Sequence, residues 1–464
     1  MENPESTKKS ALIVAVSGYF ITPFMGSSIN VALPAIAQTF HIDAVLLSWI
    51  ATAYLLAIGV TLVPMGRLSD IYGRKKIMVL GFSFFTMASL FSALSWSVYA
   101  LIVFRIIQGI GSGMFFGTTM AILTSVYPPG ERGKVLGITV SAVYIGLSSG
   151  PFIGGILTTQ IGWRSLFALT FLLSFSVLGL IFMKLKGEWA EAKGESFDIW
   201  GSLLYGLSLI ILIVGFSLLP DKKSIGLILL SVSGFIAFVV LEKRVASPVF
   251  QMDLLHHNKV FALSNLAALI HYSSTFAVTF LLSLYLQYIK SLNAQTAGLI
   301  LMAQPVMMAL FSPLAGKISD RIEPRLISSA GMALTFCGLI LFTRLTGDTH
   351  LIYIVATLLL LGFGFALFSS PNMNAIMSSV ERRFLGVASG SAGTMRVLGQ
   401  LFSMGIATLV LAVILGRVPI TAAVYPQLIK SIKFALMIFS GLTFAGIFAS
   451  LSRGNVRQQQ KRSG

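Results

Sequence analysis

Fourteen long apolar segments constrain the fold of this chain more than any other feature of its sequence. A helix needs roughly 20 apolar residues to cross a bilayer. Because lipid cannot satisfy backbone hydrogen bonds, only helices and closed barrels cross it, and segments of this length predict helices. The expected spans are residues 11–35, 46–65, 77–95, 98–126, 135–158, 165–184, 199–219, 224–241, 260–288, 297–315, 326–345, 350–372, 386–415 and 430–452.

The composition supports an all-α integral membrane protein. Apolar residues make up 56% of the 464 residues and charged residues only 11%, against about 25% in an average soluble domain. The net charge of +17 could suggest a nucleic-acid partner, but most lysines and arginines fall in alternate loops between the apolar segments. The positive-inside rule places those loops and both termini in the cytoplasm. We therefore expect a multi-pass protein of the cell (cytoplasmic or inner) membrane that contacts the lipid bilayer and binds no nucleic acid.

A short polar motif occurs twice, about 250 positions apart. The first copy is GRLSDIYGRKK, from Gly66 to Lys76, and the second is GKISDRIEPR, from Gly316 to Arg325. Asp70 of the first copy matches Asp320 of the second. The repeat predicts two related membrane-embedded halves, which alternating-access transporters use to rock about a site between them.

The repeat and the spans together predict four regions in a monomeric chain. Residues 1–184 are expected to form one six-helix bundle, and residues 260–452 a second. Residues 185–259 form a charged linker followed by two additional helices, and residues 453–464 form a basic, solvated cytoplasmic tail.

The repeated motif has a physical logic of its own. Gly66 and Gly73 are expected to allow a tight connection between antiparallel helices, and Asp70 to accept hydrogen bonds from the N–H groups of a nearby helix N-terminus. A basic membrane-facing loop would explain Arg74 and the lysines, but not the spaced glycines, the aspartate or the second copy. We therefore predict a conformational-gating motif made of Gly66, Asp70, Gly73, Arg74, Gly316 and Asp320.

Four motifs together resemble the major facilitator superfamily, and in particular its fourteen-helix drug:proton antiporter branch. The loop from Gly66 to Lys76 is similar to the signature loop of the superfamily. LIVFRIIQGIGSG, from Leu101 to Gly113, resembles the fourth-helix motif, and INVALP, from Ile29 to Pro34, resembles the end of the first-helix motif. GLSSGPFIGGIL, from Gly146 to Leu157, resembles the fifth-helix antiporter motif and is followed by the familiar pair WR.

The resemblance implies two six-helix bundles with two extra helices, and proton-coupled efflux of small amphiphilic compounds or drugs. The proton gradient would be the energy source, with no cofactor and no metal. The alternatives are an uptake symporter or anion exchanger of the same fold, or a non-transporting membrane sensor. We do not expect an enzyme, because the sequence contains no nucleophile–base constellation, metal-binding cluster or nucleotide-binding glycine loop.

Glycines spaced by four mark one face of the fifth predicted helix. Such a stripe lets two helices approach closely, and a proline within it removes a backbone donor and can kink the helix. Packing alone could explain the stripe, whereas the resemblance implies a tight, leak-resistant contact between the two halves. The predicted motif comprises Gly146, Gly150, Pro151, Gly154 and Gly155.

Arg105 is a cation within an apolar span, and Gln108 and Ser112 share its helical face. An arginine in this position is costly and usually faces a cavity or a partner, unless it lies near the helix end and reaches water. The resemblance implies a role in proton transfer or anion attraction. Arg396 is interpreted as the corresponding residue of the second half, where bonding to backbone carbonyls is the alternative to substrate contact.

Small polar residues lie on otherwise apolar helices and could face a central cavity. Each alone is more often part of an interhelical hydrogen bond than a ligand contact. His271 is the member that titrates near neutral pH, and it is either functional or a structural histidine with satisfied hydrogen bonds. The candidate cavity residues are Tyr19, Thr22, Asn30, Gln108, Asn265, His271, Gln304, Asn374 and Arg396.

All 16 aspartates and glutamates fall in loops or at the edges of predicted helices. Many multidrug antiporters of the branch carry an aspartate in the first-helix motif, at a position that aligns with Met25 here. Without a deep carboxylate to attract a cation, the sequence favours a neutral, amphiphilic or anionic substrate. The candidate proton-coupling residues are then Asp70, Arg105, Glu131, His271 and Glu381.

Overall fold

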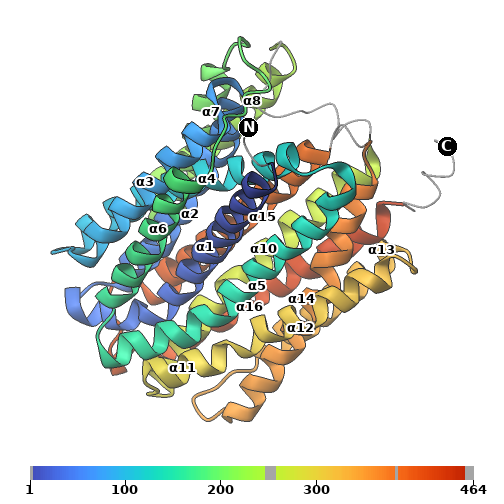
Figure 1. The fold of residues 1–464 in the computed structure, drawn as a ribbon. Helices are drawn as coiled ribbons and strands as arrows, with labels where there is room; N and C mark the ends of the chain where they lie inside the picture. The colour runs from blue at the N-terminus through green and yellow to red at the C-terminus, as the bar shows by residue number, and fades with distance from the viewer. Residues whose placement is uncertain (1–3, 246–257, 382–384, 455–464) are drawn as a thin grey trace. The chain divides into compact units, whose positions relative to one another are not determined.

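The computed structural model describes residues 4–245, 258–381 and 385–454 as helices joined by short connections (Figure 1). In this part of the chain, 14 helices are long and apolar enough to span a membrane, which confirms the all-α fold class and the predicted number. The cytoplasmic placement of both termini stays a prediction. The first eight helices are α1 (Pro4–Phe40), α2 (Ala44–Tyr72), α3 (Arg74–Ala93), α4 (Val98–Val126), α5 (Pro129–Gln160), α6 (Arg164–Lys184), α7 (Ile199–Leu218) and α8 (Lys222–Glu242).

The remaining six spans include two short π-helical extensions. The π-helix η1 continues α10, η3 continues α15, and α11 and α12 together form one span. These elements are α10 (Lys259–Leu284), η1 (Tyr285–Ile289), α11 (Ala294–Leu301), α12 (Ala303–Ser319), α13 (Pro324–Phe342), α14 (Leu351–Ser378), α15 (Leu385–Val410), η3 (Leu411–Leu415), the 3₁₀ turn η4 (Ala422–Val424) and α16 (Tyr425–Ser452).

The helices form two compact units. Unit 1 comprises Met1–Ile42 and Leu46–Phe250, and unit 2 comprises Asp43–Val45 and Gln251–Gly464. The helix pair α7–α8 lies in unit 1, where the Tyr205 hydroxyl of α7 donates a 2.9 Å hydrogen bond to the carbonyl oxygen of Gly59 on α2. The exact domain boundaries expected from the sequence stay predictions.

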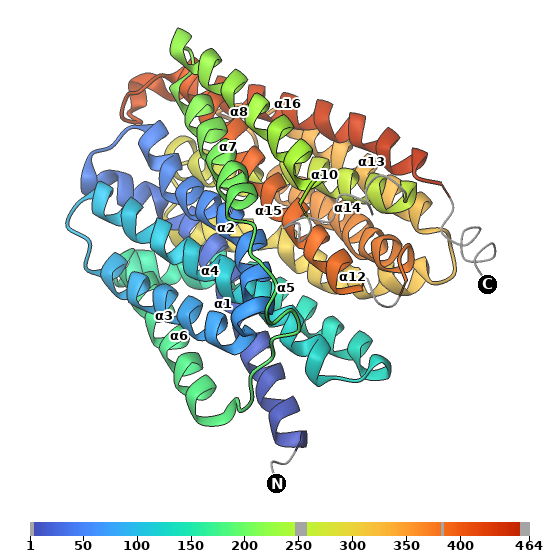
Figure 2. The same cartoon turned by 90° about the horizontal axis from the view of Figure 1, so that it is seen from above.

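The two units pack matching pairs of helices. In unit 1, α1 packs on α4, α5 and α6, and α3 packs on α4 and α6. In unit 2, α10 packs on α14, α15 and α16, and α13 packs on α14 and α16. Figures 1 and 2 both show α3 beside α6. The duplication inferred from one loop motif therefore extends to helix packing.

Glycines at matching positions bring the paired helices into backbone contact. A Cβ atom added to Gly81 on α3 would lie 2.8 Å from the carbonyl oxygen of Gly111 on α4. In unit 2, a Cβ on Gly331 of α13 would lie 2.6 Å from the carbonyl oxygen of Gly364 on α14. A larger residue would push the helices apart at either place. Both helix pairs therefore rely on glycines for their close packing.

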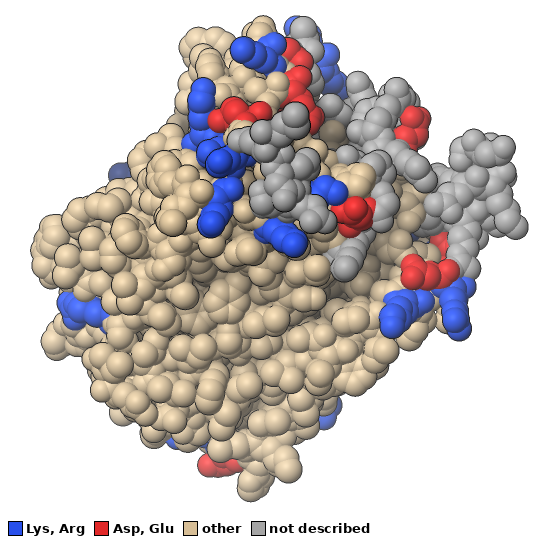
Figure 3. Space-filling model, viewed as in Figure 1, with Lys and Arg blue, Asp and Glu red and all other residues tan. Residues whose placement is uncertain are grey.

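Charged side chains gather near helix ends on the face shown in Figure 3, and the surface between those ends carries very few charges. On α8, for example, the exposed side chains include Ile225, Leu229, Leu230 and Ile236. Exposed apolar side chains along a helix of this length match a lipid environment.

Candidate functional site

The first copy of the repeated motif is mostly helical. α2 ends at Tyr72 and α3 begins at Arg74, so Gly73 alone forms the break between them. Gly73 has a φ of 119°, in the left-handed region that glycine adopts without strain. Gly66 lies within α2, so the expectation that it helps to form the turn is wrong.

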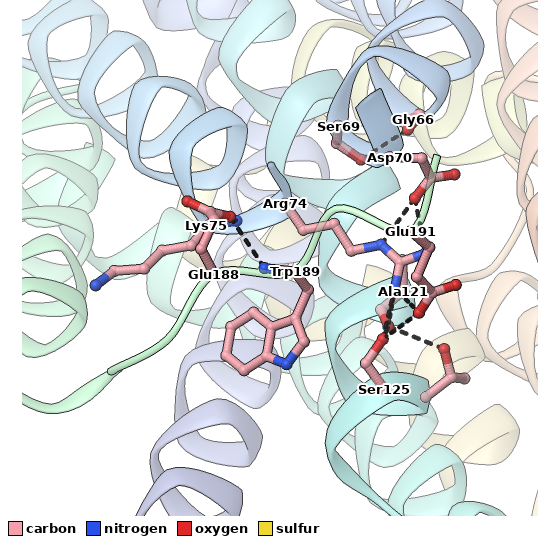
Figure 4. A network of polar contacts seen from close by, with 11 residues as sticks. Gly66, Ser69, Asp70, Arg74, Lys75, Ala121, Ser125, Glu188, Trp189 and Glu191 are labelled. Carbon is pink, nitrogen blue, oxygen red and sulfur yellow. Dashed lines mark hydrogen bonds and ion pairs between the residues drawn. The ribbon is translucent and has the colours of Figure 1, made fainter. Parts of the chain in front are cut away.

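Arg74 is the centre of a polar network at this loop (Figure 4). It is only 5% exposed, and its Nε and Nη2 atoms lie 2.8 and 2.7 Å from Oδ1 of Asp70. Nη1 donates to Oγ of Ser125 at 2.5 Å and to Oε1 of Glu191 at 2.7 Å. The Asp70 carboxylate thus accepts hydrogen bonds from the guanidinium of Arg74. This corrects the expectation that it accepts them from backbone N–H groups at a helix N-terminus.

The segment between α6 and α7, residues 185–198, lies against this loop. The N–H of Arg74 donates to the carbonyl oxygen of Trp189 at 2.8 Å, and the N–H of Ala192 donates to the carbonyl oxygen of Asp70 at 3.0 Å. In Figure 2 the segment is the green trace that leads from α6 to α7 past the end of α2. The sequence had indicated only a charged surface linker here.

The second copy of the motif repeats part of the first. Ser69 donates to the carbonyl oxygen of Gly66 at 2.6 Å, and Ser319 donates to that of Gly316 at 2.7 Å. The Asp320 carboxylate accepts a 3.2 Å hydrogen bond from Nδ2 of the half-buried Asn374 side chain. Asn374, expected in the central cavity, thus contacts the second motif.

Arg105 lies in a buried polar cluster of unit 1. It is 1% exposed, so it does not reach water from the helix end. Its Nη1 donates to Oε1 of Gln108 at 2.6 Å, its Nε donates to the carbonyl oxygen of Ile50 at 3.1 Å, and its guanidinium lies 3.9 Å from the ring centre of Tyr54. Gln108 in turn donates to Ser89 at 2.7 Å. Within the described residues Arg105 forms no ion pair.

The fifth-helix glycines pack against α1 in the same unit. A Cβ on Gly146 would lie 2.5 Å from the carbonyl oxygen of Phe20, and one on Gly150 would lie 2.8 Å from that of Phe24. A Cβ on Gly154 would lie 3.0 Å from Cα of Ser28. These contacts explain the spacing by packing within unit 1, and the contact between halves implied by the resemblance stays a prediction. α5 continues as a helix through Pro151, and Gly155 is buried.

Two candidate cavity residues of α10 have contrasting surroundings. Asn265 donates to the carbonyl oxygen of Phe261 and accepts a 3.1 Å hydrogen bond from Ser391 of α15. It therefore forms an interhelical hydrogen bond, which was the alternative to a place in the cavity. His271 is fully buried, and within the described residues neither ring nitrogen has a hydrogen-bond partner. Its ring centre lies 4.0 Å from that of Phe368. The described residues therefore do not supply the hydrogen-bond partners that a satisfied structural histidine needs.

The other candidates lie in several places. Tyr19 is buried and packs its ring on Phe116 at 4.4 Å, whereas Thr22 is half-buried. Asn30 and Gln304 are buried. Arg396 is half-buried on α15, the fifth helix of its set, so it does not correspond to Arg105 on α4, the fourth helix.

The remaining proton-coupling candidates are exposed. The Glu131 carboxylate pairs with Lys8 at 3.2 Å, and Tyr127 donates to the carbonyl oxygen of Lys8 at 2.8 Å. Glu381 is exposed at the corresponding place after α14. Neither glutamate lies within a predicted span.

Arg453 is a buried residue that the sequence reading missed. It was assigned to a solvated tail, but it is 1% exposed. It donates to Asn372 at 2.6 Å, to Ser328 at 3.0 Å and to Ser264 at 3.2 Å, and so joins α16 to α14, α13 and α10. Burial lowers its pKa to about 10; of the smaller effects, the charge of Glu323 raises the pKa and that of Arg325 lowers it further. Only its place directly after the last apolar segment could have signalled a structural role.

These features define a multi-pass membrane protein made of two related helical units. The sequence profile of the Major Facilitator Superfamily matches residues 15–404 and again residues 264–459. The chain belongs to the Major Facilitator Superfamily, and it is a transporter rather than an enzyme.

Similar proteins include drug exporters and a vitamin transporter. The riboflavin transporter RibZ of Clostridioides difficile (strain 630) is 31% identical over 398 residues, covering 85% of this chain and 86% of the relative. The tetracenomycin C resistance and export protein of Streptomyces glaucescens is 28% identical over 399 residues, covering 84% of this chain and 73% of the relative.

Solved structures support the fold. A bacterial homologue of the human lysosomal transporter Spinster, in an inward-facing and unoccupied conformation, superimposes with a TM-score of 0.70 at 13% identity, covering 96% of this chain and 97% of the other. The D-xylose–proton symporter gives a TM-score of 0.68 at 14% identity, with the same coverage.

Proposed function

We propose that this transporter exports small amphiphilic organic compounds in exchange for protons, by alternating access of a site between its two halves. The observation that carries the proposal is the Arg74 network, in which one buried guanidinium joins Asp70, Ser125 and Glu191 at the first copy of a duplicated loop. A conformational gate needs polar contacts that can break and re-form without exposing much apolar surface to water, and the Arg74 network consists of such contacts. The relatives named for drug resistance and export support the direction.

The buried charges favour an uncharged or anionic substrate. In the described spans, no aspartate or glutamate lies deeper than the terminal turns of a helix. Arg105 is a buried cation without an ionic partner among the described residues. A cation in the same environment would be repelled, whereas an uncharged amphiphile with hydrogen-bond acceptors could interact with the Arg105–Gln108 cluster.

Proton coupling would use Asp70, Arg105, Glu131, His271 or Glu381. One proton crossing 100 mV supplies about 2.3 kcal/mol, which corresponds to roughly a fiftyfold gradient of an uncharged solute. Coupling to a single proton is therefore sufficient for useful export.

Uptake of an uncharged heteroaromatic compound is the second candidate function. The compound class is supported by the 31% identity to a protein named as a riboflavin transporter, a name that gives no direction of transport. Export and uptake require opposite directions of compound movement for a given proton gradient, so one vesicle preparation distinguishes them.

The test uses the purified full chain in liposomes with an acidic interior and a trapped pH indicator. Riboflavin, ethidium and an anionic fluorescein derivative serve as the uncharged, cationic and anionic probes. We expect riboflavin or the anion to make the interior more alkaline, because protons leave as the compound enters. Asp70→Asn should abolish this response while the protein stays monodisperse. Exporter activity is excluded if no probe changes the internal pH.

A further inference from the structure

The three glutamates of the segment between α6 and α7 all contact the first copy of the repeated motif, from Gly66 to Lys76. Glu188 accepts a 2.8 Å hydrogen bond from the backbone N–H of Lys75, Glu191 accepts from Arg74, and Glu195 pairs with Arg67. We call residues 185–198 the clasp segment. It contributes one carboxylate to Arg67 on α2, one to Arg74 and one to the backbone N–H of Lys75 in the first turn of α3.

Glu188 replaces a missing helix cap. Gly73 is the N-cap residue of α3, and it has no side chain that could accept a hydrogen bond from the first N–H groups of the helix. The Glu188 carboxylate does so from another part of the chain, at the N–H of Lys75. Its negative charge also suits the positive end of the helix dipole. The start of α3 therefore depends on the clasp segment.

Glu191 shares the Arg74 guanidinium with Asp70. Asp70 binds Nε and Nη2, while Glu191 binds Nη1 together with Ser125 of α4. Without Glu191, Arg74 would keep Asp70 and Ser125. Arg74 can therefore pair with Asp70 alone or with Asp70 and Glu191 together. Release of the clasp segment does not leave the buried guanidinium without an ionic partner.

The clasp segment is held mainly by polar contacts. Between Leu185 and Asp198 only Leu185 and Ala192 are buried, and the Glu191 side chain is 65% exposed. Exposed ion pairs contribute little and weaken as salt is added. Contacts of this kind favour a reversible attachment over a permanent one.

Unit 2 holds its copy of the loop differently. The Asp320 carboxylate accepts from the amide of Asn374, on a neighbouring helix. Of the residues described after α16, Arg453 is the charged one, and it points into the unit. The acidic clasp is thus a feature of unit 1 and does not follow from the duplication.

We propose that Glu188 and Glu191 are positioning residues for the α2–α3 loop, and that the clasp segment releases and redocks as the transporter changes conformation. This inference rests on the proposed transport function, because a loop that never moves needs no release. The glutamates act through Arg74 and the start of α3.

The test follows the chemical accessibility of a reporter cysteine in the full chain. Cys337, the single cysteine, is exposed and is replaced by serine. Ala192→Cys reports on the buried side of the clasp segment, with Ala190→Cys as a second reporter, and Lys193→Cys is the exposed control. The reagent is a membrane-impermeant maleimide, applied in detergent at low and high salt.

We expect the Ala192→Cys reporter to react more slowly than the Lys193→Cys control. Adding Glu191→Gln should speed the reaction of the buried reporter about fivefold, the scale of an ion-pair contact, and Glu191→Asp should restore part of the protection. High salt should speed the reaction when Glu191 is present and have little effect in Glu191→Gln. Asp221→Asn, which removes a carboxylate from the start of α8, should leave the reaction rate of the buried reporter unchanged.

Equal reaction rates with Glu191 and with Glu191→Gln, in both salt conditions, would show that Glu191 does not hold the segment and would overturn its role. In liposomes, protection of the Ala192→Cys reporter that is unchanged while riboflavin turns over would make the segment a fixed brace and overturn the proposal. The detergent measurement does not depend on transport, so a failure of proton-coupled export would be seen separately.

Discussion

Arg453, directly after α16, donates a 2.6 Å hydrogen bond to Oδ1 of Asn372 on α14, although the two residues lie 81 positions apart. The same guanidinium reaches Ser264 and Ser328. Four helices therefore meet at one buried cation directly after the last span.

We predict that Arg453→Ala lowers the free energy of unfolding by about 3 kcal/mol, because it leaves buried acceptors without their charged donor. Arg453→Lys should recover part of the loss, since an ammonium group cannot reach all three acceptors at once. Deleting residues 455–464 is the matched control and should have little effect. Thermal unfolding in detergent measures the differences, and equal stability of Arg453→Ala and the wild type would contradict a structural role.

Substitution of Gly150 tests the close contact between α1 and α5. Gly150→Ala should destabilise the protein by about 1–3 kcal/mol, because the added methyl group would lie 2.8 Å from the carbonyl oxygen of Phe24. Gly137→Ala, on the same helix with no atom within 4 Å of the added Cβ, should instead stabilise it by about 0.5–1 kcal/mol. Denaturation curves of the two variants should move in opposite directions. A neutral Gly150→Ala would show that the helices are less closely packed.

We predict that His271 lowers the stability of the folded protein and contributes to the pH dependence of transport. Its two ring nitrogens are buried without hydrogen-bond partners among the described residues, and an unsatisfied buried polar group costs about 1–3 kcal/mol. His271→Phe, beside Phe365 and Phe368, should therefore raise the unfolding temperature while it slows transport or removes its pH dependence. A variant with lower stability and an unchanged pH profile of transport would contradict this prediction.

The sequence was sufficient for the features that depend on local composition or spacing. The hydropathy of each span predicted its helix, and the four-residue spacing of Gly146, Gly150 and Gly154 predicted one packed face. Gln108 lies three positions after Arg105, and the predicted shared face became a 2.6 Å hydrogen bond. Periodicity carries such information because it is a property of the helix itself.

Contacts between distant polar residues could not be predicted in this way. Glu191 lies in a segment without periodicity, and its partner Arg74 is 117 positions away. Arg453 looked like the start of a polar tail, because no pattern distinguishes a buried arginine from a solvated one. Asn374 looked like a cavity residue, and its hydrogen bond to Asp320 depends on how α12 and α14 pack.

The most direct test of proton-coupled export is the steady-state accumulation of riboflavin, or of whichever probe proves active, in liposomes with a fixed pH gradient. A gradient of one pH unit corresponds to ~1.4 kcal/mol for each proton exchanged, or about tenfold accumulation of an uncharged compound. We predict that the compound accumulates when the interior is acidic and that an uncoupler releases it. Accumulation with an alkaline interior, or accumulation that an uncoupler does not change, would contradict proton-coupled export.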